Sequence, residues 1–376
     1  MRVEFFKHSL GGEEARAARK ALRSLILTTG ETVDHFERAL ARYLGVREAV
    51  GLMSCTAGLH LALAAAGVGP GDEVITTPLS FVATANAIMM AGAKPVFVDV
   101  EPETGNINAE LIPAAITKRT AAIMPVHLYG QMADMKLILQ IAKRKKLIVI
   151  EDAAHALEAK RDNLQPGQKS FGACFSFYAT KSITSGEGGA FATQSREAAA
   201  AMRSLRSHGI TSEMAQRRRT GLTTYDVDRL GWKANMSNIQ AALLIPQLKK
   251  AEAQWRRRKA ITDEYRRAFQ NAGIEMPSVL PRSTHSHHLF PIWVDHGRRD
   301  RVMDELKARG VETAINYPPI HLFSFYRKTF GYTKGDFPVA ESISRRTISL
   351  PLYPKLTERE VRYVINAIQR VMSNEQ

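Results

Sequence analysis

The strongest constraint on the fold of this chain is a regular alternation of apolar strands and helices over its first 210 residues. The strand-like segments are short and continuously apolar, and the segments between them show helical spacing of apolar residues. This alternation is typical of a largely parallel sheet that helices cover on both faces. We therefore expect helices at 57–66, 81–93, 109–116 and 134–146, and strands at 71–77, 94–100, 120–128 and 147–153.

The pattern changes beyond residue 210. A polar, arginine-rich segment at 211–233 has no apolar periodicity and predicts a long loop, and long ordered loops are often functional. A helical stretch follows at 237–273, in which Pro246 predicts a kink or the start of a new helix.

The last third of the chain predicts a smaller α/β domain. Its elements are a strand at 288–294 and helices at 299–310 and 357–372. We place the boundary near residue 250, which gives a large domain (1–250) and a small C-terminal domain (251–376).

Composition and charge argue against several classes of protein. The formal charge is +15, but the basic residues form short runs without a zinc-finger, RNP-type or helix-turn-helix pattern, so we expect no nucleic-acid binding. A basic surface favours anionic phosphates instead. No segment approaches the ~20 apolar residues of a membrane span, and the first residues do not resemble a signal peptide. Cys55 and Cys174 cannot form a disulfide framework or a zinc site, so we expect a cytoplasmic protein.

The segment SCTAG at 54–58 precedes the helix expected at 57–66. Its small residues let the backbone approach an anion, and the first N–H groups of a helix have no intrahelical acceptor. Plain N-capping by Ser54 or Thr56 is the simpler explanation, and a phosphate site is the alternative.

Two carboxylates, Glu151 and Asp152, come directly after a buried apolar strand. In open α/β sheets, ligands bind at the carboxyl ends of the strands. Because adjacent strand residues point to opposite faces, only one of the two carboxylates faces a ligand easily. Pairing with a structural Arg or Lys is the alternative role.

Lys181 follows Asp152 by 29 positions and lies between two apolar segments, FSF and GGAFAT. Lysine is usually exposed, but these neighbours favour a partly buried amine with a lowered pKa. The nearby Gly186, Gly188 and Gly189 permit close backbone approach. A buried lysine suits Schiff-base chemistry. Pyridoxal phosphate requires such a lysine, a carboxylate beside its ring nitrogen, a phosphate cup and an apolar wall.

Two other motifs suggest ligands less strongly. GVGPGD at 67–72 is not a dinucleotide fingerprint, since it follows a helix and ends in Asp72, and we interpret it as a helix end and turn. HSHH at 285–288 opens the strand expected at 288–294, where alternate histidines would face opposite sides, so we expect no metal site.

Several segments together resemble the DegT/DnrJ/EryC1/StrS family of pyridoxal-phosphate enzymes, which act on nucleotide-linked keto-sugars. They are SCTAG, GDEVITTPLSFVATANA, PVFVDV, PVHLYGQMADM, IEDAAHALEA, FSFYATKSITSGEGG and RSHG. The resemblance covers nearly the whole chain and implies an α/β fold of the fold-type-I aminotransferases. That fold has a large domain with a mostly parallel seven-stranded sheet between helices, and a smaller C-terminal α/β domain.

The resemblance also implies roles for individual residues. Lys181 matches the lysine that holds the cofactor and moves the proton, Asp152 the partner of the ring nitrogen, and His155 the contact to the phenolic oxygen. The further cofactor positions implied are Thr56 and Ala57 (backbone) and Ser176 for the phosphate, Phe81 over the ring, and Asn235 from the second subunit of a homodimer.

Within the family, TTPLSFVATANA and SHHLFPI resemble enzymes that transfer an amino group from L-glutamate to C4 of a UDP-linked 4-keto-sugar, for lipopolysaccharide or other cell-surface glycans. The chain reads KANMS at 233–237 where many members read NYRMS. The alternatives are C3 amination of a dTDP-linked keto-sugar, a dehydratase, or a non-enzymatic cofactor-binding regulator. Relatives that dehydrate carry histidine at the lysine position, so Lys181 favours transamination.

Overall fold

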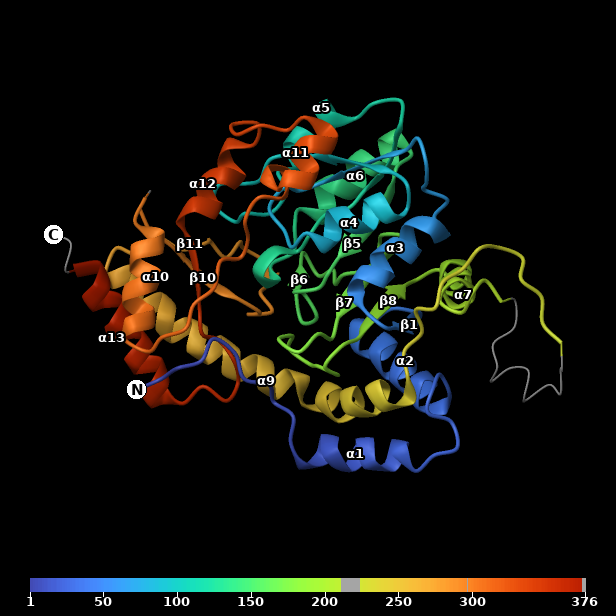
Figure 1. Cartoon of the computed structure of the whole chain (residues 1–376), viewed down its shortest axis with the longest axis horizontal. Coiled ribbons are helices and arrows are strands. Elements are labelled where there is room, and N and C mark those ends of the chain that lie inside the picture. Colours follow the sequence, from blue (N-terminus) through green and yellow to red (C-terminus); the bar gives the residue numbers. More distant parts are fainter. Residues whose placement is uncertain (211–223, 296, 374–376) are drawn as a thin grey trace.

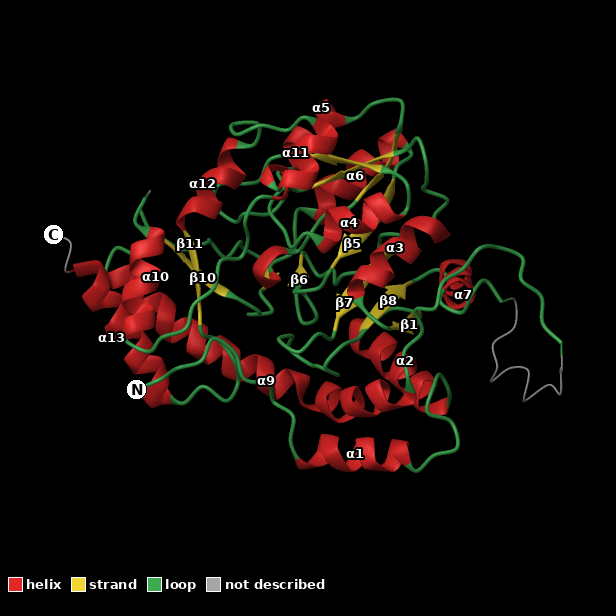
Figure 2. Cartoon of the chain, in the orientation of Figure 1, coloured by secondary structure: helices red, strands yellow, loops and turns green. Residues whose placement is uncertain are grey.

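The computed structural model describes residues 1–210, 224–295 and 297–373. Within them, a seven-stranded sheet forms the centre, with helices on both faces (Figures 1 and 2). The strand order is β1-β8-β7-β5-β4-β2-β3. These strands are β1 (Glu48–Leu52), β2 (Glu73–Thr76), β3 (Lys94–Phe97), β4 (Thr120–Ile123), β5 (Ile148–Asp152), β7 (Gly172–Ser176) and β8 (Gly189–Thr193).

The sheet is mostly parallel, as expected. Strand β8 runs antiparallel to its neighbours β1 and β7, and the other paired strands are parallel. The helices of this part are α1 (Gly12–Leu22), α2 (Glu31–Leu44), α3 (Cys55–Ala65), α4 (Ala83–Met90), α5 (Ile112–Ala115), α6 (Met135–Lys145) and α7 (Arg196–Leu205), with 3₁₀ turns η1 (Ala109–Leu111) and η2 (Leu128–Gly130).

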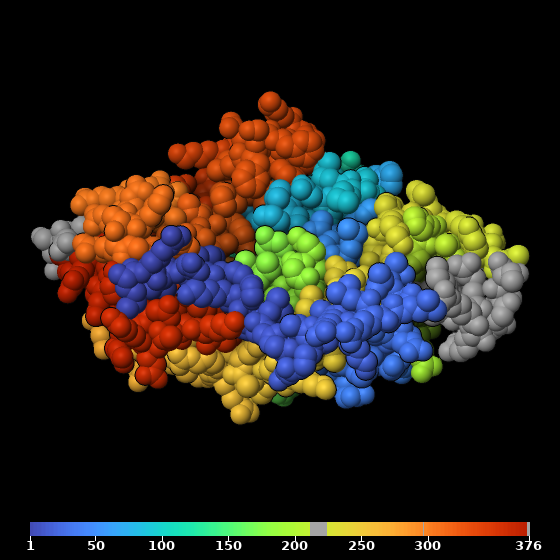
Figure 3. All heavy atoms as spheres, turned by 60° about the horizontal axis from the view of Figure 1, so that its bottom comes forward, coloured from blue at the N-terminus to red at the C-terminus, as the bar shows by residue number. Residues whose placement is uncertain are grey.

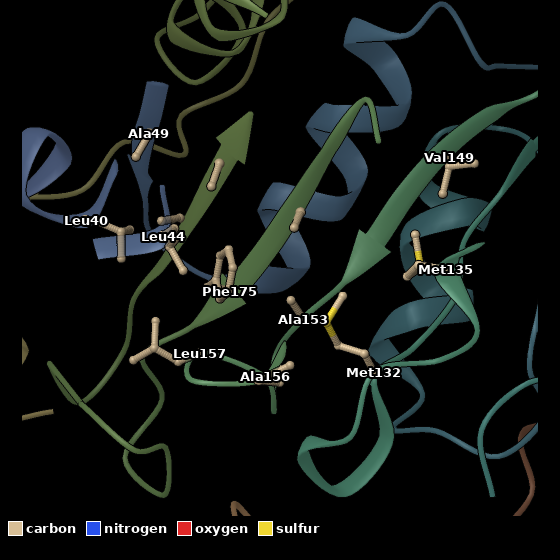
Figure 4. Packing of buried hydrophobic residues seen from close by; sticks show 14 of the residues in the cluster. Leu40, Leu44, Ala49, Met132, Met135, Val149, Ala153, Ala156, Leu157 and Phe175 are labelled. Carbon is tan, nitrogen blue, oxygen red and sulfur yellow. The ribbon is translucent and has the colours of Figure 1, made fainter. Parts of the chain in front are cut away.

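The main core lies between the sheet and the helices on one of its faces. Figure 4 shows Leu40 and Leu44 from α2 near Phe175 of β7, with Val149 of β5 further along the same apolar layer. All four side chains are buried. Burial of each of these side chains contributes roughly 1.5–3 kcal/mol to the stability of the fold. The strands β5 and β7 are therefore firmly held.

Helix α9 (Asn238–Asn271) runs beneath both parts of the molecule (Figure 1). It passes through Pro246 without ending, so the expected start of a new helix does not occur. Leu244 and Leu248 on either side are buried in the main core and hold the helix in place. Gln247 Nε2 also donates to the Leu243 carbonyl at 2.6 Å, beside the turn that the proline disturbs.

The remaining elements form a second α/β layer. Strands β10 (Phe290–Trp293) and β11 (Thr347–Leu350) pair antiparallel, and β6 (Lys160–Arg161) pairs with β9 (Ser283–Thr284). The helices are α10 (Arg299–Ala308), α11 (Ser324–Phe330), α12 (Pro338–Arg346) and α13 (Glu358–Ser373), with a 3₁₀ turn η3 (Ile320–Leu322).

This second part has its own apolar cluster. Ile261, Tyr265 and Phe269 from the last half of α9 contribute to it, and so does Val3 from the other end of the chain. In Figure 3 the N-terminal residues, in dark blue, lie against the orange and red C-terminal part. The boundary near residue 250 stays a prediction, and Val3 shows that the first residues of the chain pack with the second core.

Candidate active site

A cavity of about 490 Å³ opens where β5 and β7 end and α3 and α4 begin. This is the position at which open α/β sheets bind ligands. Of the eight residues that the sequence predicts for the site, six line this cavity: Thr56, Phe81, Asp152, His155, Ser176 and Lys181.

Lys181 lies in the loop between β7 and β8, where its backbone N–H donates to the Tyr178 carbonyl at 2.9 Å. Its amino group lines the cavity, and burial lowers its pKa from 10.5 to about 8. Nearby Asp152 and Cys55 partly oppose that shift. A larger fraction of the amine is therefore neutral, and nucleophilic, near neutral pH than in an exposed lysine.

Position 189, at the end of the lysine loop, has no room for a side chain. A Cβ atom there would lie 2.3 Å from the Ser54 carbonyl carbon and 2.4 Å from the Cys55 nitrogen. The backbone of β8 therefore packs directly against the start of α3. No residue with a side chain could approach Ser54 and Cys55 as closely as Gly189 does. The close backbone approach expected from the glycine cluster is present, and it joins the lysine loop to the helix start at 54–56.

Asp152 ends β5 and is 5% exposed. Thr84 Oγ1 donates to its Oδ2 at 2.7 Å, and the Ala154 N–H donates to its Oδ1 at 3.1 Å. Because the Thr84 proton points to Asp152, Ser80 must donate to Thr84 across their 2.9 Å contact. Burial raises the Asp152 pKa, and the bonds from Thr84 and Ala154 partly offset that effect.

Glu151 faces the other side of the sheet, as the alternation of strand side chains predicts. It accepts hydrogen bonds from His127 Nε2 (2.8 Å), the Gly167 N–H (2.8 Å) and Ser170 Oγ (2.5 Å). His127 Nδ1 accepts from the Ala133 N–H, so its proton is on Nε2. Glu151 is thus a structural carboxylate, although its partners are not the Arg or Lys that we considered.

His155 lies beside two residues that the sequence analysis did not select for the site. Tyr317 OH lies 3.0 Å from His155 Nε2, and the His288 ring lies 4.3 Å from the His155 ring. His288 Nε2 also lies 3.4 Å from Lys181 Nζ. HSHH was considered only as a metal motif, yet the segment SHHLFPI carried part of the resemblance and could have pointed to His288.

Ser54 is the N-cap of α3, since its side chain accepts the Ala57 N–H at 3.1 Å. The N-capping by Ser54 that the sequence predicts as the simpler explanation is therefore observed. Ala57 does not line the cavity, whereas Ser54, Cys55 and Thr56 do. The phosphate roles of Thr56, Ala57 and Ser176 stay predictions, and the N–H of Ala57 is already bonded to Ser54.

Asn235 does not line the cavity of its own chain. Its Nδ2 donates to Thr29 Oγ1 at 2.5 Å, and its backbone forms a bridge with Leu52. The role expected for Asn235 across a subunit interface stays a prediction. The arginine-rich segment 211–233 lies partly outside the described residues, which resume at 224.

Metal and membrane motifs find no support in the described ranges. No group of three or more His, Cys, Asp or Glu residues there is placed to hold a metal ion. Likewise, none of the helices in those ranges is both long enough and apolar enough to cross a bilayer. GVGPGD forms the turn after α3, where Gly67 has a φ of 75°, as expected of a helix end.

Comparison with known proteins decides the family. The model of the DegT/DnrJ/EryC1/StrS aminotransferase family matches residues 8–369. The chain belongs to this family.

Relatives of this aminotransferase extend over its whole length. The spore coat polysaccharide biosynthesis protein SpsC of Bacillus subtilis is 40% identical, over 99% of this chain and 98% of SpsC. A sugar aminotransferase of Streptococcus pneumoniae, solved in its PLP form, superposes with a TM-score of 0.93 at 29% identity, over 100% of this chain and 99% of that one. Helicobacter pylori PseC, an aminotransferase involved in the biosynthesis of pseudoaminic acid, gives a TM-score of 0.92 at 29% identity, over 100% of both chains.

This chain is therefore a sugar aminotransferase with the fold-type-I architecture, and its cofactor is pyridoxal phosphate. The expectations of fold, enzyme class and cofactor are confirmed. The cavity fits the cofactor: buried Asp152 has no ion-pair partner among the described residues, and His155 Nδ1 has no hydrogen-bond partner among them. A buried carboxylate without a cation suits a protonated ring nitrogen.

Proposed function

We propose that this aminotransferase moves an amino group from L-glutamate to C4 of a UDP-linked 4-keto-sugar, in the biosynthesis of lipopolysaccharide or another cell-surface glycan. The observation that carries the proposal is the shared cavity of Lys181 and Asp152, with a lysine pKa of about 8. SpsC takes part in spore coat polysaccharide biosynthesis and PseC in the biosynthesis of pseudoaminic acid, and both support a product used in a polysaccharide or a related sugar.

When bound, pyridoxal phosphate supplies an electron sink for the carbon that loses its proton. Lys181 holds the cofactor, and its freed amine then takes the proton from the donor carbon and returns it to the second carbon. Asp152 stabilises a proton on the ring nitrogen, and Thr84 and Ala154 keep its charged form available. His155 and Phe81 line the same cavity and would contact the cofactor ring, His155 through its phenolic oxygen and Phe81 through its face.

Two residue groups support the sugar class. The segment 76–87, which carried the resemblance to C4 enzymes, contributes Ser80, Phe81, Ala83 and Thr84 to the cavity. Phe81 is 59% exposed and lies 6.1 Å from the Tyr317 ring, so these two rings form an aromatic edge of the cavity. The basic surface of a chain with charge +15 attracts a diphosphate.

We also propose a homodimer in which Asn235 reaches the active site of the other subunit. The segment 26–29 lies beside Asn235, because Asn238 Nδ2 donates to the Ile26 carbonyl at 2.8 Å and Asn235 donates to Thr29. The neighbouring Leu25 is 91% exposed and Leu27 is 44% exposed. Exposed apolar side chains that lie close to the Asn235 amide suit a protein interface.

The test is a panel of UDP-, GDP- and dTDP-linked 4-keto-sugars and the corresponding 3-keto-sugars, each incubated with ¹⁵N-glutamate. The proposal expects one ¹⁵N-amino group on the UDP-4-keto-sugar, detected by product mass, and its position assigned by NMR. Preferred amination of a dTDP-3-keto-sugar would replace the proposal with the C3 alternative. Loss of the amino-sugar in Lys181→Ala checks that this lysine carries the reaction.

A further inference from the structure

The amino group of Lys181 lies close to His288, a residue to which we have assigned no role in binding the cofactor. His288 Nε2 lies 3.4 Å from Lys181 Nζ, and the two residues are far apart in the sequence. The contact is at the long end of the range for a hydrogen bond. Catalytic hydrogen bonds in ligand-free sites are often long and shorten when substrate is bound.

The His288 ring is held in place from the cavity side. It is 8% exposed, and its ring lies 4.3 Å from the ring of His155 at an interplanar angle of 38°. His155 is itself held by Tyr317 through the 3.0 Å contact to its hydroxyl. Since β10 begins two residues after His288, the backbone is anchored too. The imidazole therefore cannot turn away from Lys181 without disturbing this packing.

The electrostatic surroundings keep His288 neutral. Burial lowers its pKa well below the ordinary value, and Lys181, His155, Arg258 and His285 lower it further. A neutral imidazole has one donor and one acceptor nitrogen. An ammonium group has only N–H donors, so the nitrogen that faces a protonated Lys181 must be the acceptor.

We propose that His288 is a further catalytic residue of this aminotransferase, whose Nε2 accepts a hydrogen bond from the Lys181 ammonium formed during proton transfer. The inference rests on the proposed role of Lys181 as proton carrier. In that step the donor C–H bond breaks, an N–H bond forms on Nζ, and the electron pair passes to the cofactor. The same proton then leaves Nζ for the second carbon, and His288 neither gains nor loses a proton.

A partly buried ammonium is stabilised by such an acceptor. Among the described residues, the titratable groups that interact with Lys181 include Cys55, Asp152, His155 and His288. Tyr178, Glu187 and Tyr317 line the same cavity, and Lys7, His8 and Arg258 line a neighbouring pocket with Lys181. Asp152 is committed to the ring nitrogen in the proposed reaction, and burial raises the pKa of the Cys55 thiol, which keeps it neutral. His288 is then the group best placed to stabilise the ammonium by a hydrogen bond, an interaction that accounts for roughly a ten- to hundredfold effect when the donor is charged.

The first test measures the Lys181 pKa in the full-length chain without added cofactor. An amine-reactive reagent is applied across a pH series, and labelling of the Lys181 peptide is followed by mass spectrometry. Because the pKa of Lys181 is lowered to about 8, we expect half-maximal labelling of the wild type near pH 8. His288→Leu removes the acceptor and disfavours the ammonium, so its midpoint falls by about one pH unit. His288→Gln keeps an acceptor oxygen and a midpoint near the wild-type value.

A matched control stands next in the sequence. His287 is also buried, but its ring packs against Trp255 at 6.1 Å rather than against Lys181. Its φ of 53° is one that Asn tolerates, so His287→Asn keeps the backbone and the wild-type midpoint. If His288→Leu does not fold, His288→Met serves as the second variant without a nitrogen acceptor.

The second test uses the holoenzyme. His288→Leu lowers kcat at least ~10-fold with little change in KM, and glutamate deuterated at its α-carbon gives a larger isotope effect than in the wild type. A His288→Leu midpoint that stays near pH 8 overturns the inference, and so does an equal shift in His287→Asn. Failure of the wild type to transfer any amino group overturns the proposed function instead, and leaves the midpoint comparison valid.

Discussion

At the scale of single residues, Asp152 and its neighbour Glu151 lie on opposite faces of β5, and we expect a catalytic role for Asp152 and a structural role for Glu151. Asp152→Asn keeps the shape and loses the charge that stabilises the ring proton, so kcat should fall at least ~100-fold. Glu151→Gln places an amide among three donors, so it should lower the free energy of unfolding by about 1–3 kcal/mol with kcat within a few-fold of the wild type. Steady-state kinetics and urea denaturation separate the two effects. Equal losses of kcat would contradict this division.

Thr84 tests the hydrogen bond that opposes the burial of Asp152. Burial raises the pKa of Asp152, and the bond from Thr84 lowers it. Thr84→Val removes that bond, so the carboxyl protonates at a higher pH than in the wild type. We measure cofactor affinity by fluorescence quenching across a pH series. As the pH is lowered, Thr84→Val should lose affinity at a higher pH than the wild type does. Matching profiles for Thr84→Val and the wild type would show that the bond is not important.

The sequence predicts the residues of this site whose signal is local. Lys181 stands beside a glycine cluster, Asp152 ends an apolar strand, and both roles can be inferred from neighbouring residues. From the second part of the chain, Tyr317 reaches the cavity and His288 reaches Lys181, and no local sequence pattern predicts contacts of that range. Thr84 was missed for another reason: a threonine inside an apolar helix pattern carries no sign that its hydroxyl meets a carboxylate.

At the scale of elements, α9 supports the lysine loop. Gln247 Oε1 accepts the Thr184 N–H at 3.0 Å, and its Nε2 donates to the Thr184 carbonyl at 2.7 Å. Gln247→Ala leaves these buried backbone groups without their partner, so it should lower the free energy of unfolding by about 2–4 kcal/mol. Urea denaturation measures the loss. Gln270→Ala, at an exposed position of the same helix, should change little, and equal effects would contradict the account.

The elements themselves were predicted more reliably than their ends. The periodic segments predicted the right helices and strands because their apolar residues are buried in two large clusters that include the strands of the sheet. The helix expected at 57–66 begins at Cys55, since Ser54 caps it. Pro246 was expected to act through local geometry, but packing of the buried residues around it holds one helix of 34 residues together.

At the scale of the whole molecule, the proposed dimer places Leu25 in an interface. Leu25→Glu puts a charge at this site on both subunits, so the dimer should dissociate at least ~100-fold more readily, as measured by sedimentation equilibrium. Leu111→Glu is the control, because Leu111 is also exposed (46%) but ends η1 directly before α5, which lies at the opposite edge of the molecule from α1 in Figure 1. An undiminished dimer in Leu25→Glu would place the interface elsewhere.

The central claim is that Lys181 binds the cofactor of this sugar aminotransferase. Its most direct test is to incubate the full-length chain with pyridoxal phosphate, reduce the linkage with borohydride and map the labelled peptide by mass spectrometry. The account predicts one stable label on Lys181, and none at this site in Lys181→Ala. A label on a different lysine, or no stable label in the wild type, would contradict it.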